Sequence, residues 1–359
     1  MVGASPQALK ALLNATSTAA VDAALAEFPI ATPEEYQRDY DGQHVGTWRE
    51  GYLHWLPVGL DRGNSGRIKL AGEPTNPIAE RLVNGMEALI ELERLRELKK
   101  QPDSAMPISP RDAVQRYFKL PRLDLLPSIG GEEGKALTER VRKVRKKLQI
   151  TLAQDSKSKE FSVEVRDFGM GQTPPKIHRT LLSLGNTDKA EKPYLIGVFG
   201  QGGSSAFAAS SYSVIVSRRC SDVLAPGEND GVGWTVVKKV VPKRPRRDPY
   251  FAYLATSQEG AVPRFDAAIA DKAGFEFGSS FRHIKYDFAS GGSAIARVLY
   301  QALNHVLFNP ILPYELFALK SEPDQMMGTA HRLARLVRNI KRSGEPGSLD
   351  KSFSNQAVV

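Results

Sequence analysis

The chain has 359 residues, 41% hydrophobic and 25% charged, with a formal net charge of +9, which suits a globular protein of two domains or of one large domain with extensions. No stretch approaches the roughly 18 apolar residues of a membrane span, and the N-terminus lacks a secretory signal pattern, which favours a soluble protein of the cytoplasm. Cys220 is the only cysteine, so an internal disulfide and a cysteine-rich zinc site are excluded, and we expect its side chain in the core.

Two basic runs stand out, and clustered Lys and Arg side chains can bind nucleic acid because they displace counterions from its phosphate backbone. A solvated helix face and a basic loop would give the same pattern, so DNA is one of two interpretations. The first run contains Arg140, Arg142, Lys143, Arg145, Lys146 and Lys147, and the second contains Lys243, Arg244, Arg246 and Arg247.

Residues 1–65 are predicted to form an N-terminal extension, with helical spacing of Ala and Leu up to about Phe28 and then an irregular stretch rich in Trp and Tyr. A long helix is predicted to begin at Asn76-Pro77, because Asn caps helices and Pro suits the first helical position, and to end near Lys100. Its apolar residues recur at helical spacing and give the helix a stripe for the core, formed by Ile78, Leu82, Met86 and Leu89.

Polar residues of the same helix are also regularly spaced. Glu80, Asn84 and Glu87 stand at positions i, i+4 and i+7, so they share one face and can point into a single site. From the helix alone, they are equally well explained as its solvated side.

Residues 148–153 and 161–166 are short β-type runs that predict a hairpin. The second run leads into residues 167–171, Asp-Phe-Gly-Met-Gly, where two glycines permit a sharp turn and the close approach of a ligand. Later strands are predicted around residues 212–217, 233–241, 250–256 and 280–286, and helices are predicted to resume from about Ser293.

Between residues 173 and 195 the sequence changes from helix-like to polar, as in a mobile cover over a site. The glycine-rich residues 197–205 follow and open a helix rich in Ala and Ser. Free N–H groups and the positive dipole end at such a helix start suit phosphate groups. The tail from Ser343 is predicted to be disordered.

These segments resemble, in the same order, the motifs of the GHKL ATPases, the family of gyrase B, heat-shock chaperones, histidine kinases and MutL. Residues 80–88 are similar to its helix signature of Glu, Asn and an Asp-Ala pair, residues 167–171 to its Asp-x-Gly-x-Gly box, and residues 197–202 to its lid-end glycine box. Residues 183–187 resemble the lid segment of the chaperones, and Gly278-Ser279 stands where the family has Gly-Thr.

The resemblance covers residues 71–288, with Glu87 in place of the usual Asp, Ser279 in place of Thr and Gly203 in place of a bulkier residue. It implies an α+β fold of the Bergerat type, a two-layer α/β sandwich in which helices cover one face of a mostly antiparallel sheet. The implied ATP-binding domain spans residues 66–290, with a lid at about residues 172–199. A C-terminal helical segment and flexible tail would occupy residues 291–359.

The resemblance also implies ATP and Mg²⁺ as cofactors and gives roles to individual residues. Glu80 would orient and deprotonate the attacking water, Asn84 would bind Mg²⁺, and Asp167 would accept a hydrogen bond from the adenine amino group. The other nucleotide-binding residues that it implies are Glu87, Ala88, Gly169, Met170, Gly171, Gly185, Asn186, Thr187, Gly197, Val198, Phe199, Gly200, Gln201, Gly202, Gly203, Ser204 and Ser279.

The function expected from the resemblance is Mg²⁺-dependent binding and slow hydrolysis of ATP, which drives a lid and a homodimer to clamp a protein partner or DNA. An alternative is an ATP-sensing module without significant turnover that signals through a partner protein, although the presence of Glu80 favours hydrolysis. The chain has no Gly-x-x-x-x-Gly-Lys-Ser/Thr loop, and its Asp-Phe-Gly lacks the other protein-kinase motifs.

Overall fold

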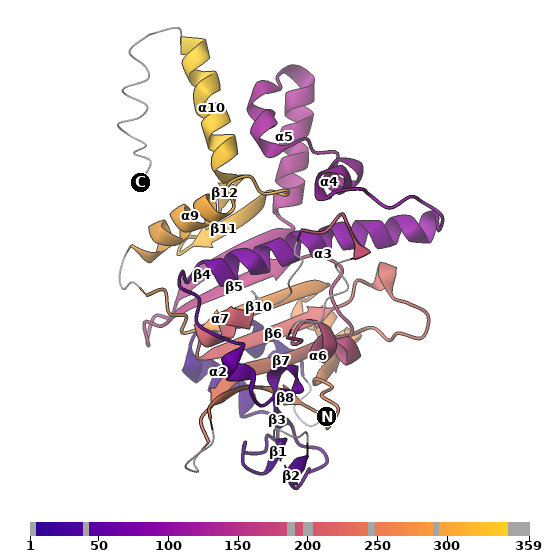
Figure 1. Ribbon diagram of the computed structural model, residues 1–359, viewed down its shortest axis with the longest axis vertical. Coiled ribbons are helices and arrows are strands. Elements are labelled where there is room, and N and C mark those ends of the chain that lie inside the picture. Colours follow the sequence, from indigo (N-terminus) through magenta and orange to yellow (C-terminus); the bar gives the residue numbers. More distant parts are fainter. Residues whose placement is uncertain are drawn as a thin grey trace.

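A computed structural model describes residues 5–38, 43–184, 191–196, 204–242, 248–289 and 294–343. Its centre is a ten-stranded sheet in the order β12-β11-β4-β5-β10-β6-β7-β8-β3, with β9 paired to β7 beside this path (Figure 1). Neighbouring strands of this sheet are antiparallel except β11 and β4, which run parallel. The strands are β3 (His54–Pro57), β4 (Leu148–Gln154), β5 (Phe161–Asp167), β6 (Tyr212–Arg218), β7 (Gly231–Val240), β8 (Tyr250–Ala255), β9 (Arg264–Asp266), β10 (Gly278–Ile284), β11 (Tyr314–Ala318) and β12 (Asp324–Met326).

Helices lie on both sides of this sheet, and a separate hairpin joins β1 (Tyr36–Arg38) to β2 (His44–Gly46). The mostly antiparallel sheet with its helices confirms the predicted α+β class. None of the helices in the described ranges is long and apolar enough to cross a membrane. The helices are α1 (Pro6–Asn14), α2 (Thr18–Leu25), α3 (Asn76–Lys100), α4 (Pro110–Phe118), α5 (Gly131–Arg145), α6 (Ile177–Thr180), α7 (Ser205–Ala208), α8 (Ala267–Ala273), α9 (Ile295–Val306) and α10 (Gly328–Ser343).

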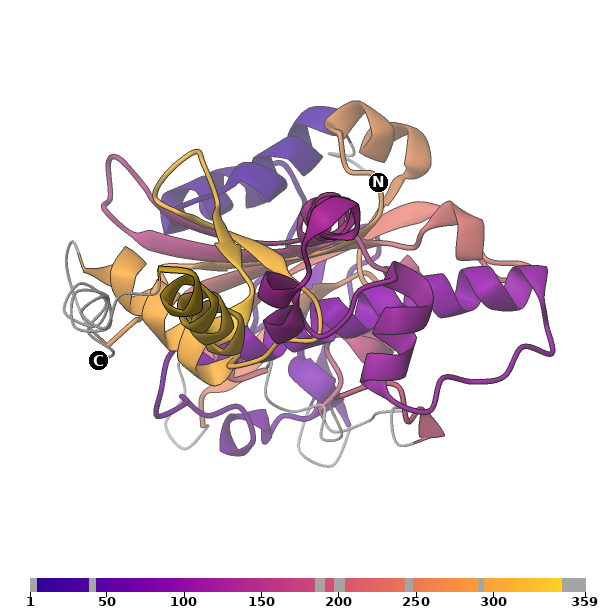
Figure 2. The same cartoon turned by 90° about the horizontal axis from the view of Figure 1, so that it is seen from above.

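The expectation that helices cover only one face of the sheet is wrong for the half that contains β6, β7 and β8. Figure 2 shows α1, α2 and α8 on one side of the sheet and α3 on the other. Alternate residues of β6 explain this arrangement, because both sets are apolar: Val214 and Val216 pack with Leu9 of α1, whereas Ile215 packs with Phe207 of α7 on the opposite face. A strand that is apolar on both faces needs cover on both.

The long helix α3 spans the predicted residues and buries the predicted stripe. None of its stripe residues is more than 1% exposed, and they pack on β4 and β5. One detail differs, because Thr75 rather than Asn76 stands at the N-cap position and its side chain makes no capping hydrogen bond. Cys220 is buried in a small cluster with Leu92 of α3, as expected for a core cysteine.

The six strands predicted from the sequence, β4, β5, β6, β7, β8 and β10, lie within two residues of their predicted bounds. The sequence did not reveal the other four strands of the sheet. β3, from the N-terminal segment, pairs with β8, and β11, from the C-terminal segment, pairs with β4. The segment from residue 291, which was expected to be helical, therefore also contributes β11 and β12; its predicted tail after Ser343 lies outside the described residues.

The turn after β5 depends on glycine at position 171. Its φ is +61°, in the left-handed region that residues with a Cβ rarely adopt, and an added methyl group would lie 1.8 Å from the carbonyl oxygen of Arg218. The backbone of this turn therefore lies directly against the end of β6, and Cys220 donates its backbone N–H to the carbonyl oxygen of Met170 at 2.9 Å. Only glycine permits this approach.

Replacing Gly171 by Ala should destabilise the fold by at least about 3 kcal/mol, because backbone strain and atomic overlap act together. The matched control is Gly227→Ala, since Gly227 also has a positive φ, +83°, but nothing within 4 Å of an added Cβ; it should cost only about 1–2 kcal/mol. Urea denaturation measures both. Equal losses in the two variants would contradict the close approach.

Candidate functional site

The predicted polar face of α3 runs from an exposed to a buried end. Glu80 is exposed, Asn84 is half-buried and Glu87 is only 3% exposed. The Glu87 carboxylate accepts a hydrogen bond from the backbone N–H of Ile196 at 2.7 Å. This contact crosses more than a hundred residues of sequence, so the face of α3 meets the chain just before the glycine-rich residues 197–203.

A second pair of contacts holds the same segment on α3. Glu91, one turn beyond Glu87, accepts hydrogen bonds from the Tyr194 hydroxyl and from Lys192 Nζ, the latter at 3.0 Å. Glu91 is 8% exposed and Tyr194 3% exposed. The acidic residues of α3 therefore extend the predicted row by one turn and fix residues 192–196 in place.

The turn after β5 packs directly on the same helix. Met170 donates its backbone N–H to the carbonyl oxygen of Ala88 at 3.0 Å. A methyl group added to Gly169 would lie 2.5 Å from Ala88 Cβ, and one added to Gly85 would lie 3.4 Å from Asp167 Cβ. The two segments predicted to form one site are thus in contact, and Gly169 permits that contact because it lacks a side chain; at Gly85 the close neighbour of an added methyl group is Leu148, at 2.6 Å.

Two serine hydroxyls lie in register with Asp167 on the next two strands of the sheet, β10 and β6. Ser279 of β10 is the register partner of Asp167, and its Oγ lies 2.9 Å from Ser217 Oγ of β6. Ser217 Oγ also accepts the backbone N–H of Gln172 at 2.9 Å. Both serines are at most 5% exposed. Asp167, Ser279 and Ser217 thus form a buried polar row across β5, β10 and β6.

Burial raises the pKa of the Asp167 carboxyl from its ordinary value to about 6, although the charge of Arg166 and the backbone N–H groups of Gly169 and Ser279 act to lower it. The Gly169 N–H donates to Asp167 Oδ1 at 2.9 Å. At neutral pH this buried carboxyl is therefore still mostly ionised. A buried carboxylate with remaining lone pairs can accept hydrogen bonds from a ligand.

At the other end of the site, Ser204 is 9% exposed and directly precedes α7, which packs on α3. The structure thus brings Glu87, Ala88, Asp167, Gly169, Met170, Gly171 and Ser279 together, and Glu80 and Asn84 continue the same helix toward its N-terminus. The remaining predicted residues lie outside the described ranges: Gly185, Asn186, Thr187, Gly197, Val198, Phe199, Gly200, Gln201, Gly202 and Gly203.

Arg81 is a member of this region that the sequence pattern did not indicate. It follows Glu80 on α3, is only 6% exposed, and its guanidinium carbon lies 4.1 Å from the centroid of the Phe281 ring on β10. A signal was present, because Arg81 stands three residues after Ile78 and directly before Leu82, among apolar core positions. A charged residue at such a position is rare unless it has a partner.

The first basic run, on α5, is partly neutralised by ion pairs. Arg142 pairs with Glu139 at 2.6 Å, and Arg145 pairs with the buried Glu315 of β11 at 3.1 Å. Arg140 and Lys143 are exposed. α5 extends from the same end of the molecule as α10 (Figure 1). The second run, residues 243–247, lies outside the described part of the chain.

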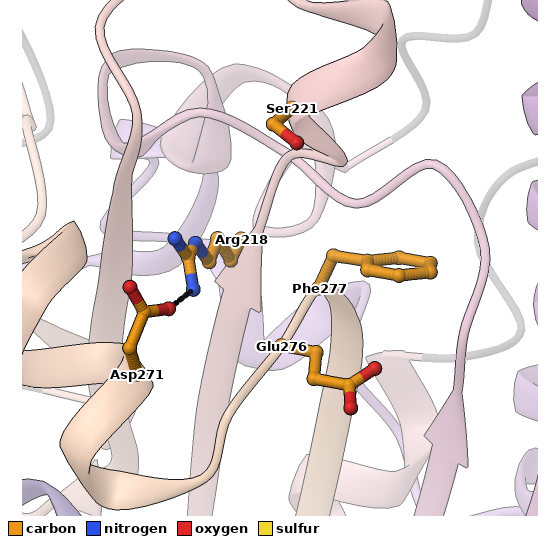
Figure 3. A pocket seen from close by; sticks show the side chains of 5 residues that line it. All are labelled: Arg218, Ser221, Asp271, Glu276 and Phe277. Atoms are coloured by element: carbon orange, nitrogen blue, oxygen red, sulfur yellow. Dashed lines mark hydrogen bonds and ion pairs between the residues drawn. The ribbon is translucent and has the colours of Figure 1, made fainter.

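A hollow of about 210 Å³ lies at the end of β6 and shares no lining residue with the contact between α3 and Asp167. Its walls carry both charges, and Arg218 there is paired with Asp271 at 2.6 Å (Figure 3). Arg218 also pairs with Asp230 at 2.7 Å. Because two aspartates already pair with the Arg218 guanidinium, Arg218 offers no unpaired positive charge to a ligand in this hollow. Its lining residues are Arg218, Ser221, Asp271, Glu276 and Phe277.

Within the described ranges, no three His, Cys, Asp or Glu side chains gather in a way that could hold a metal ion by themselves. Neither models of protein families nor curated proteins give a match to this chain.

The raised pKa of Asp167 predicts how stability depends on pH. Between the ordinary value of 3.8 and about 6, the folded chain binds more protons at this carboxyl than the unfolded chain. Lowering the pH from about 7 to about 4.5 should therefore add stability through Asp167, and Asp167→Asn should lack this contribution. Urea denaturation at both pH values measures the difference between the two proteins. An identical pH dependence in wild type and Asp167→Asn would contradict it.

Proposed function

We propose that this chain is a GHKL-type ATP-binding domain with a Bergerat fold, which binds ATP with Mg²⁺ and hydrolyses it slowly. The observation that carries the proposal is the packing of the Asp167 turn on the polar helix α3. Gly169 meets Ala88, and Met170 bonds to the Ala88 carbonyl oxygen at 3.0 Å. Four separate stretches of sequence thereby supply one buried carboxylate, two serine hydroxyls and an acidic helix face.

In this proposal, Asp167 recognises the adenine ring. Its carboxylate is buried and mostly ionised at neutral pH, so it can accept a hydrogen bond from an amino group. Guanine carries an oxygen at the corresponding position, so the same carboxylate selects against it. Ser279 and Ser217, which bond to each other beside Asp167, add hydroxyl groups at the same end.

Glu80 and Asn84 act at the phosphate groups of the nucleotide. Hydrolysis of a phosphoanhydride requires a positioned water molecule and neutralised charge on the terminal phosphate. Glu80, exposed on the second turn of α3, is suited to orient that water and take its proton. The amide oxygen of Asn84, one turn further on, fits Mg²⁺, because this ion prefers oxygen ligands and takes one or two from protein when phosphates and water provide the rest.

Glu87 has a positioning role. The Glu87 carboxylate lies one methylene further from the backbone than the Asp of the family would, and it accepts the Ile196 N–H. Together with Glu91 it holds residues 192–196 on α3. Residues 197–203 follow directly, so we infer that these acids set the position from which the glycine-rich segment reaches the phosphates.

The proposed cellular role is a clamp in the cytoplasm, in which ATP orders the lid of about residues 172–199 and a homodimer, and hydrolysis resets them. Its partner would be a protein or DNA, and Arg140 and Lys143 of α5 are exposed for contact with a phosphate backbone. The alternative is an ATP-sensing module that signals through a partner protein without significant turnover. Phosphate release distinguishes the two.

Glu80→Gln should bind ATP with an affinity within about threefold of wild type but lose phosphate release by about 10²–10⁴-fold, because Gln keeps the shape of Glu and cannot take a proton. Steady-state phosphate release and calorimetry measure the two quantities. Glu132→Gln, an exposed change on α5, is the control and should change neither. Wild type that binds ATP and releases no phosphate would favour the sensing module.

Asp167→Asn should weaken ATP binding by about 10-fold or more, because an ionised acceptor is replaced by an amide in a buried site. Calorimetry with ATP and with GTP measures it, and the loss should be confined to ATP. Asp222→Asn, at an exposed carboxylate that pairs with Arg96, is the control. Unchanged ATP affinity in Asp167→Asn would contradict the adenine assignment.

A further inference from the structure

Arg81 is a buried cation whose surroundings supply little negative charge. Its guanidinium carbon lies 4.1 Å from the ring centroid of Phe281 and 5.4 Å from that of Phe207. Within the described ranges no carboxylate lies in ion-pair distance of Arg81, and its Nε has no hydrogen-bond partner. Burial lowers the pKa of Arg81 to about 10, with Glu80 acting to raise it, so the side chain stays charged at neutral pH.

Of the three other described arginines that are buried to a similar degree, Arg94 and Arg218 have carboxylate partners, whereas Arg62 stacks on Tyr250 and donates to Gln37. Arg94, 7% exposed, pairs with Glu97 at 2.7 Å and donates to Ser104. Arg218, also 7% exposed, has two aspartates. Cation–π contacts such as those of Arg81 contribute less stability than the burial of an uncompensated charge costs. The position of Arg81 thus costs stability that an apolar residue would not.

The neighbouring histidine does not compensate the charge of Arg81. His283 is fully buried, its Nδ1 lies 2.7 Å from Ser213 Oγ, and burial together with the charge of Arg81 lowers its pKa to about 3. It is therefore neutral and supplies no counter-charge. What Arg81 lacks is an anion.

The place of Arg81 indicates which anion fits. It adjoins Glu80 on α3, and Phe207, which it contacts, belongs to α7, the helix that begins directly after the glycine-rich residues 197–203. A guanidinium plane matches a phosphate group because two N–H groups can donate in parallel. We propose that Arg81 binds the terminal phosphate of the nucleotide and lets the site distinguish a triphosphate from a diphosphate.

This inference rests on the proposed ATP-binding function and is tested by substituting Arg81 with Met, which keeps the length and the packing on Phe281 but removes the charge. Calorimetry with Mg²⁺ should show ATP affinity reduced about 10–100-fold and ADP affinity within about threefold, since only ATP carries the terminal phosphate. Arg81→Lys should fall between wild type and Arg81→Met. Arg297→Met, at an exposed basic position of α9, controls for general electrostatics.

Equal losses for ATP and ADP in Arg81→Met, or no loss for either, would overturn the inference while leaving the ATPase proposal intact. If Arg81→Met folds poorly, a thermal-shift experiment on wild type and Arg81→Lys tests the same inference. Inorganic tripolyphosphate should raise the melting temperature of wild type and should raise that of Arg81→Lys less; equal shifts would overturn the role of Arg81. Wild type that binds neither ATP nor ADP would overturn the proposed function, and a wild type without any tripolyphosphate shift would overturn the phosphate site as well.

Discussion

The contact between the Asp167 turn and α3 is the constraint on which the rest of the site depends. It requires glycine at position 169, which fits against Ala88, whereas Gly85 of α3 makes room for Leu148 of β4, to which an added methyl group would approach within 2.6 Å. A single added methyl group at Gly169 would lie 2.5 Å from Ala88 Cβ and would separate the helix from the turn. The Met170 to Ala88 hydrogen bond then fixes the register of the two segments.

Around this contact, the chain accepts buried charge that costs stability. Asp167 has a raised pKa because its ionised form is poorly solvated, and Arg81 has lost the solvation of its guanidinium. Other buried charges, such as Glu91 with Lys192 and Arg145 with Glu315, have partners that offset the cost. Asp167 at the end of β5 and Arg81 on α3 combine deep burial with incomplete compensation, which is the pattern of groups kept for a ligand.

The large apolar sheet supplies the stability that this site gives up. β6 to β8 are buried on both faces, under α1, α2 and α8 on one side and under α6 and α7 on the other. The β4 and β5 half packs under α3, α4, α5 and α9. Strands from near both ends of the chain, β3 and β11, extend the same sheet at its two sides. The strands β5 and β10, which carry Asp167 and Ser279, are therefore interior strands.

The sequence by itself determined the elements with strong local signals: α3, the β4–β5 hairpin, four further strands and the face shared by Glu80, Asn84 and Glu87. These depend on spacing and turn residues within a few positions of each other. Only the tertiary structure decided that α1, α2 and α8 cover a second face, that β11 joins β4, and that Arg81 lies buried beside Glu80. Such facts arise from contacts between residues far apart in the chain, whose pairing no local pattern encodes.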